Sequence, residues 1–160
     1  MSLTVVLALP RPKVLRRLIM DMTSLGVNKL IIVNSYRSEK SYWQSPLLNR
    51  IDEFVFEGLQ QAIDTVPLVV EFKKRFKPFV EDEFSALLGD AVIAHPYASQ
   101  SWKTYLDTNT MPKVLCIGAE GGWIDYEVNL LCQHGCTSVS LGARILRTET
   151  VVNVLLGRWL

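Results

Sequence analysis

The sequence has few of the residues that build metal sites and disulfide frameworks. Its 160 residues include three cysteines and two histidines. Three cysteines cannot all pair, and Cys132, His134 and Cys136 alone supply too few ligands for a tetrahedral metal site. We therefore expect reduced, structural cysteines, no metal centre and a cytoplasmic location.

Long apolar runs and a strong excess of one charge are also missing. The apolar runs fall far short of the roughly 20 residues that span a bilayer, and residues 1–7 lack the basic segment of a signal peptide. The formal net charge is +1, so a nucleic-acid partner needs a local basic patch. With 49% hydrophobic and 21% charged residues, the composition predicts a globular chain, one domain over residues 1–160, with no membrane segment.

Apolar runs alternate with stretches of helical periodicity along the chain. Short continuous apolar runs predict strands, and apolar residues at a spacing of 3.6 predict helices. The predicted strands cover residues 3–9, 29–33, 67–72, 91–95, 114–117 and 137–141, and the predicted helices cover residues 12–25, 45–62, 78–88, 99–106, 124–133 and 146–159. This alternation predicts an α/β fold, a parallel sheet with helices on both faces.

Glycine and charge are concentrated in two loops near the C-terminus. Residues 117–127 read IGAEGGWIDYE, and residues 141–152 read LGARILRTETVV. Each loop follows a predicted strand and precedes a predicted helix, at the sheet edge where such folds bind ligands. Glycines there permit close approach of backbone to a ligand. Neither GxGxxG after the first strand nor GxxxxGK[ST] is present, which disfavours a dinucleotide fold and a P-loop NTPase.

Each of these features also has a simpler interpretation. Gly121-Gly122 alone is typical of a tight turn, and only the second loop favours a pocket. Arg144 and Arg147 are either solvated or face an external anion, because cations oppose the dipole at a helix start. Glu149 either stabilises the helix start or has a functional role.

Together the two loops resemble the signature of the RsmE family, the uridine N3-methyltransferases of small-subunit ribosomal RNA in the SPOUT superfamily. The resemblance rests on residues 117–122 and 141–150, with further matches at His95-Pro96, residues 25–27 and Arg37-Ser38. It extends from about Leu7 to the C-terminus. The family implies a deep C-terminal trefoil knot, S-adenosylmethionine (SAM) as methyl donor, RNA as substrate and an obligate homodimer.

The resemblance also implies which residues form the site. Arg37 is the implied substrate-side arginine, and Arg37 or Arg147 is the candidate that stabilises the uracil anion formed when N3 loses its proton. The alternative interpretation of His95 is a structural histidine whose hydrogen bonds are satisfied within the protein. The predicted cofactor-binding residues are Ile93, His95, Pro96, Ile117, Gly118, Glu120, Gly122, Leu141, Gly142, Leu146, Arg147 and Thr148.

The chain departs from the family on the acceptor side. Asp21 and Ser24 occupy positions that usually hold Lys and Glu, and the segment around Asp64 lacks the usual arginines. The chain also starts where the methyltransferase domain starts, so we expect the family's N-terminal PUA-like RNA-binding domain to be absent or supplied in trans. Two hypotheses follow: a SAM-dependent methyltransferase of N3 of a uridine in ribosomal RNA, or a catalytically weak SAM-binding paralogue acting as an RNA-associated or assembly factor.

A basic stretch with interleaved phenylalanines covers residues 72–79. It either grips an RNA backbone with stacking rings or forms an amphipathic junction whose phenylalanines face the core. The acidic residues at 81–83 cancel much of its field and favour the junction. The aromatic residues Tyr36, Tyr42, Trp43 and Trp102 either stack a base or fill a dimer interface.

Overall fold

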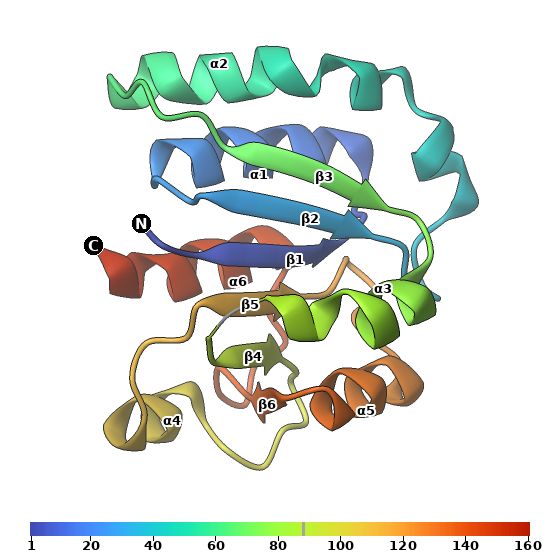
Figure 1. The fold of residues 1–160 in the computed structure, drawn as a ribbon, viewed down its shortest axis with the longest axis vertical. Helices are drawn as coiled ribbons and strands as arrows, with labels where there is room; N and C mark the ends of the chain where they lie inside the picture. The colour runs from blue at the N-terminus through green and yellow to red at the C-terminus, as the bar shows by residue number, and fades with distance from the viewer. Residues whose placement is uncertain (88) are drawn as a thin grey trace.

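Six parallel strands form one sheet (Figure 1) in the computed structural model, which describes residues 1–87 and 89–160. The strand order is β3-β2-β1-β5-β4-β6, and every pairing is parallel. The strands are β1 Thr4–Ala8, β2 Lys29–Val33, β3 Val69–Lys73, β4 Ala91–Ala94, β5 Val114–Ile117 and β6 Cys136–Val139. The predicted parallel sheet is confirmed.

Helices connect the strands and cover both faces of the sheet. They are α1 Pro12–Ser24, α2 Ile51–Ala62, α3 Phe76–Asp82, α4 Trp102–Thr108, α5 Asp125–Gln133 and α6 Thr148–Leu156. Short 3₁₀ turns are η1 Lys40–Gln44, η2 Pro46–Arg50, η3 Phe84–Ala86 and η4 Gly157–Trp159. These helices are all too short or too polar to traverse a bilayer in the described part of the chain.

The start of the first helix follows its sequence closely, whereas several other boundaries differ from the prediction. Pro12 occupies the first position of α1, where its missing N–H has no cost. The helix expected from residue 45 begins as 3₁₀ turns, because the Leu48 N–H bonds back to the Ser45 carbonyl three residues away (3.2 Å). The helix expected at 78–88 runs from Phe76 to Asp82, and its expected end at Leu88 lies outside the described residues.

Two apolar cores lie on opposite faces of the sheet. Side chains alternate along β1, so Leu7 packs with α1, α2 and α6, whereas Val6 packs with α3 and α5. Helices α1 and α2 lie side by side in Figure 1. Their close approach needs Gly58, because a Cβ there would lie 2.7 Å from the Thr23 Cβ.

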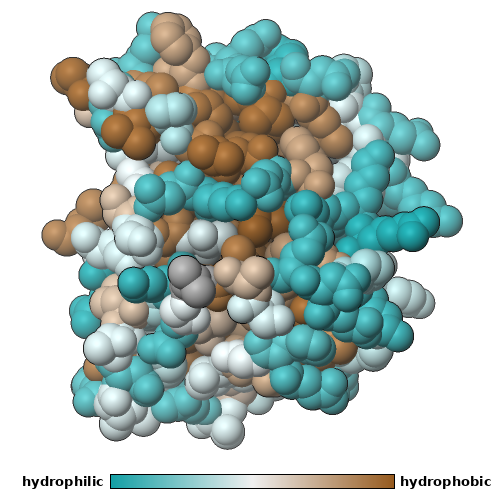
Figure 2. Space-filling view, in the orientation of Figure 1, coloured by the Kyte–Doolittle hydropathy of each residue, from teal (hydrophilic) through white to brown (hydrophobic). Residues whose placement is uncertain are grey.

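The basic stretch around β3 belongs mainly to the second core. The Phe76 ring lies 5.7 Å from that of Trp123, and Phe79 is buried. The Lys73 ammonium lies 2.8 Å from the Glu83 carboxylate. These contacts favour the second interpretation of residues 72–79, an amphipathic junction whose phenylalanines face the core. Figure 2 shows one face of the molecule on which apolar surface lies beside α2 and β3, among hydrophilic side chains.

Candidate functional site

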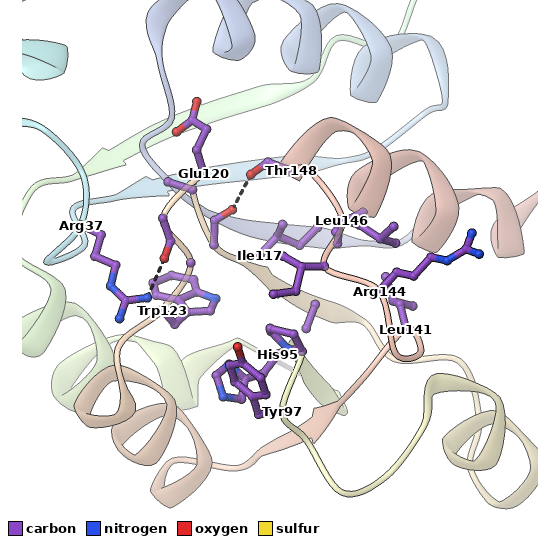
Figure 3. A pocket seen from close by; sticks show the side chains of 18 residues that line it. Arg37, His95, Tyr97, Ile117, Glu120, Trp123, Leu141, Arg144, Leu146 and Thr148 are labelled. Carbon is purple, nitrogen blue, oxygen red and sulfur yellow. Dashed lines mark hydrogen bonds between the residues drawn. The ribbon is translucent and has the colours of Figure 1, made fainter.

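A cavity opens at the carboxyl edge of the sheet, beyond the ends of β4 and β5 (Figure 3). Its volume is about 190 Å³. The walls come from the segments that follow β2, β4, β5 and β6 and from the first turns of α6. The lining residues are Arg37, Ala94, His95, Pro96, Tyr97, Ile117, Gly118, Ala119, Glu120, Gly121, Gly122, Trp123, Leu141, Arg144, Ile145, Leu146, Thr148 and Val151.

Most of the predicted site residues therefore meet in one place, and three do not line the cavity. Ile93 is fully buried, because it alternates to the face packed by α3 and α5. Gly142 is exposed and has a φ of 115°. Arg147 is exposed and forms the N-cap of α6, with an extended backbone that makes this helix start two residues later than predicted.

Other lining residues were not among the predicted ones. Tyr97 follows His95-Pro96 directly, and Trp123 follows Gly122. Each lies next to a predicted site residue in the sequence, and this proximity was the only sequence feature that indicated a place in the site. It was not enough, because the turns at strand ends change the direction of side chains in ways that strand or helix periodicity does not describe. Trp123 is 4% exposed, whereas Tyr97 is 80% exposed.

The first glycine loop, residues 118–122, folds tightly on itself. The Gly122 N–H donates to the Ala119 carbonyl at 2.9 Å, which closes a turn. Gly122 has φ of 71°, a conformation that side chains disfavour. A Cβ on Gly118 would lie 3.1 Å from the Gly122 Cα and 3.2 Å from the Trp123 nitrogen. The backbone itself thus forms this wall of the cavity.

A hydrogen bond joins the two glycine-containing loops. The Thr148 hydroxyl donates to the Gly118 carbonyl at 3.1 Å, as the dashed line in Figure 3 marks. Thr148 is 4% exposed and is the first residue of α6. The contact holds the start of α6 against the end of β5, so the two loops form adjoining walls of the cavity.

Two charged side chains tie the first loop to other parts of the chain. The Arg37 guanidinium donates to the Gly121 carbonyl at 2.7 Å through Nη1 (Figure 3). The Glu120 carboxylate points away from the cavity and accepts the Arg11 backbone N–H at 2.9 Å. Both contacts span more than 80 residues of sequence and hold the loop in one position.

Buried polar atoms without a protein partner mark the inner wall. The His95 Nδ1 and the Trp123 indole nitrogen are both buried and unbonded within residues 1–87 and 89–160. A buried unsatisfied group costs about 1–3 kcal/mol. Because both residues line the cavity, a polar atom of a bound ligand could form the hydrogen bonds that these two nitrogens lack.

Burial also lowers the pKa of His95, an effect that the charge of Asp125 partly offsets. A folded-state pKa below the unfolded value of about 6.5 means that the unfolded chain binds more protons in the interval between the two. Stability is therefore expected to fall as pH drops through that interval. Urea unfolding between pH 8 and pH 5 should show this slope, and His95→Gln should reduce it. A matched control is His134→Gln, which should leave the His95 contribution in place; an unchanged slope in His95→Gln contradicts the prediction.

Several solved structures of methyltransferases share this fold. Ribosomal RNA small subunit methyltransferase E of Neisseria gonorrhoeae, bound to S-adenosyl methionine, has a TM-score of 0.79 at 23% identity, covering 98% of this chain and 64% of its own. The SpoU methyltransferase AviRb of Streptomyces viridochromogenes, in complex with AdoMet, has a TM-score of 0.59 at 18% identity, covering 96% of this chain and 57% of its own. The chain shares the fold of these two methyltransferases.

The chain belongs to the RNA methyltransferase domain family, whose sequence profile matches residues 1–160. Ribosomal RNA small subunit methyltransferase E of Treponema pallidum is 31% identical over 162 residues, 92% of this chain and 58% of that relative. The enzyme of the same name from Synechocystis sp. is 30% identical over 164 residues, 99% of this chain and 52% of that relative. The resemblance to the RsmE family is confirmed, and the chain spans little more than half the length of these relatives. The trefoil knot stays a prediction.

Proposed function

We propose that this protein is a SAM-dependent RNA methyltransferase that methylates N3 of a uridine in ribosomal RNA. The observation that carries the proposal is the hydrogen bond between Thr148 and Gly118, which joins two family-matching loops around one cavity. The names of the relatives support ribosomal RNA as the substrate, and the solved structures support SAM as the cofactor. A homodimer and a cytoplasmic location are further parts of this proposal.

The residues present fit such a cofactor. Glycines at 118, 121 and 122 leave backbone groups open to an adenine edge, and Ile117, Leu141 and Leu146 provide apolar walls for its faces. The unpartnered nitrogens of His95 and Trp123 provide polar atoms on the same wall. When bound, SAM supplies the activated methyl group. The protein's own task is then to orient the uracil and to exclude water.

Arg37 is the better placed of the two candidate catalytic arginines. Its guanidinium has five N–H donors, one of which holds Gly121. The remaining donors are available to stabilise negative charge on a uracil oxygen after N3 loses its proton. Arg147 lies outside the cavity lining, so a role in the reaction depends on movement or on a second subunit.

The departures from the family lie at the opposite edge of the sheet. Ser24 ends α1 just before β2, and Asp64 precedes β3, so both lie near the amino-terminal ends of the parallel strands. The Ser24 hydroxyl donates to the Met20 carbonyl and the Gly58 carbonyl, between α1 and α2. Because the cavity is at the carboxyl edge, these changes leave its lining unaltered, and both hypotheses keep a cofactor site.

One experiment tests the proposal. Purified protein is incubated with labelled SAM and small-subunit ribosomal RNA from cells that lack its gene, and the RNA is digested to nucleosides. We expect labelled N3-methyluridine. Binding of SAM without transfer to any RNA would support the SAM-binding paralogue instead. Absence of SAM binding would overturn both hypotheses.

Replacing Arg37 with alanine is expected to slow methyl transfer by about 10²–10³-fold, the usual effect of removing a preorganised donor. The loss arises because the developing charge on uracil loses its partner and the Gly121 carbonyl loses its donor. Single-turnover rates with saturating SAM and RNA provide the measurement. Arg158→Ala, an exposed arginine in η4, is the control and should transfer at the wild-type rate. An unchanged rate in Arg37→Ala removes this residue from the site.

A further inference from the structure

A buried carboxylate lies just outside the cavity. Glu127 is 3% exposed and occupies the third position of α5. Its carboxylate forms no ion pair with any described residue. Burying an unpaired carboxylate is costly unless hydrogen bonds satisfy it. Both of its oxygens are indeed used, each by a different backbone N–H.

One of the two hydrogen bonds has an ordinary structural explanation. The Ile124 N–H donates to Oε1 of Glu127 at 2.9 Å. Ile124 is the N-cap residue of α5, and a glutamate at the third position commonly accepts this N–H. A helix cap of this kind is usually exposed and needs only one oxygen, so it explains neither the burial nor the second bond.

The second hydrogen bond crosses to another element of the fold. The Tyr36 N–H donates to Oε2 of Glu127 at 3.0 Å, across 91 residues of sequence. Tyr36 belongs to the loop after β2, and its side chain is 80% exposed. The same loop is also held by Ser38, whose hydroxyl donates to the Leu9 carbonyl at 2.8 Å. Glu127 is thus one of the groups that hold this loop in place.

The residue after Tyr36 is the cavity arginine. The Arg37 backbone is held through Tyr36 by Glu127, and the Arg37 guanidinium is held by the Gly121 carbonyl at 2.7 Å. Gly121 and Glu127 belong to one continuous segment that runs from the end of β5 into α5. A Cβ on Gly121 would lie 2.8 Å from the Arg37 Cβ, so the segment is shaped around this side chain.

We propose that Glu127 is a positioning residue that holds Arg37 in place at the cavity. This inference rests on the proposed function for its role in methyl transfer. A carboxylate suits the position because two backbone donors need two acceptor oxygens. A glutamine offers one oxygen and one NH₂ group, and the NH₂ group is a donor that cannot accept from a second N–H. In Glu127→Gln the Tyr36 or the Ile124 contact is therefore lost.

A double-mutant cycle distinguishes positioning from a merely structural role. Glu127→Gln is expected to lower kcat about 10-fold, by analogy with the roughly 10–100-fold losses that follow removal of groups that orient metal ligands. The KM for SAM should change by less than about 3-fold on the same reasoning. In an Arg37→Ala background the same change should have no further effect on kcat, because there is no guanidinium left to position. Losses that multiply in the double variant overturn the proposal. Glu53→Gln, a first-turn acid of α2, is the matched control and should retain the wild-type kcat.

Two further measurements keep the test decisive. If Glu127→Gln does not fold, judged by its thermal unfolding, Glu127→Asp keeps the charge but shortens the reach and should produce the same kcat loss. The proposed function fails if the wild type methylates no RNA. The positioning of Arg37 is then measured by NMR from its guanidinium Nη–H signal, because Nη1 is the atom that donates to the Gly121 carbonyl. We expect faster solvent exchange of that N–H in Glu127→Gln than in Glu53→Gln. Equal exchange overturns the inference.

Discussion

Replacing Gly118 with alanine is expected to weaken SAM binding at least about 10-fold, equivalent to about 1.4 kcal/mol. The added Cβ would lie 3.1 Å from the Gly122 Cα and 3.2 Å from the Trp123 nitrogen. Both are backbone atoms, so no side chain can rotate away to relieve the contact. The loop has to open by a few tenths of an ångström, which moves the glycine wall and the Gly118 carbonyl that Thr148 holds. Calorimetric titration with SAM measures the change.

The control for this variant is another glycine in an open place. A Cβ on Gly157 would meet no described residue beyond its chain neighbours within 4 Å, and the φ of Gly157 is −58°. Gly157→Ala should therefore bind SAM with the wild-type affinity. Wild-type affinity in Gly118→Ala would mean that the first loop adapts freely and that its shape does not determine the site.

Replacing Thr148 with valine is expected to destabilise the fold and the site together. Valine has nearly the same shape but cannot donate, so the Gly118 carbonyl loses the hydroxyl that lies 3.1 Å away. Since Thr148 is 4% exposed, water cannot easily replace that donor. We expect a loss of about 1–3 kcal/mol in the free energy of unfolding and weaker SAM binding as the loops separate. Urea unfolding and calorimetric titration measure the two effects.

Two companion variants separate the hydrogen bond from the packing. Thr148→Ser keeps the hydroxyl and should recover most of the SAM affinity. Thr150→Val changes an exposed threonine of the same helix and should leave both quantities near wild type. A Thr148→Val variant with wild-type affinity would show that the link between the loops is not needed to form the site.

The local elements were largely predictable because each is governed by neighbouring residues. Residues 29–33 read KLIIV, an apolar run after Lys29 that ends in three β-branched residues, and β2 covers the same residues. Gly26 ends α1 with φ of 79°, as expected for a glycine after a helix. The helix predicted from residue 45 differs because competing local bonds form the 3₁₀ turns that precede α2.

The order of the strands was not predictable in the same way. β1 pairs with β5, more than 100 residues later in the chain, and β4 lies between β5 and β6. Parallel strands of similar apolar composition carry no local mark of which neighbour they choose. This order nevertheless decides the site, because it brings the ends of β4 and β5 together with Arg37 from the loop after β2.

By itself the sequence determined the class of fold, the two glycine loops and most of the cavity lining, because apolar period, turn chemistry and motif spacing are properties of neighbouring residues. The tertiary structure decided which charged groups serve the site. It placed Arg147 outside the cavity lining, turned Glu120 toward Arg11, and joined the buried Glu127 to the loop that carries Arg37. These outcomes depend on contacts between segments far apart in the chain, and the direction of a side chain at a loop end is set by the element that packs against it.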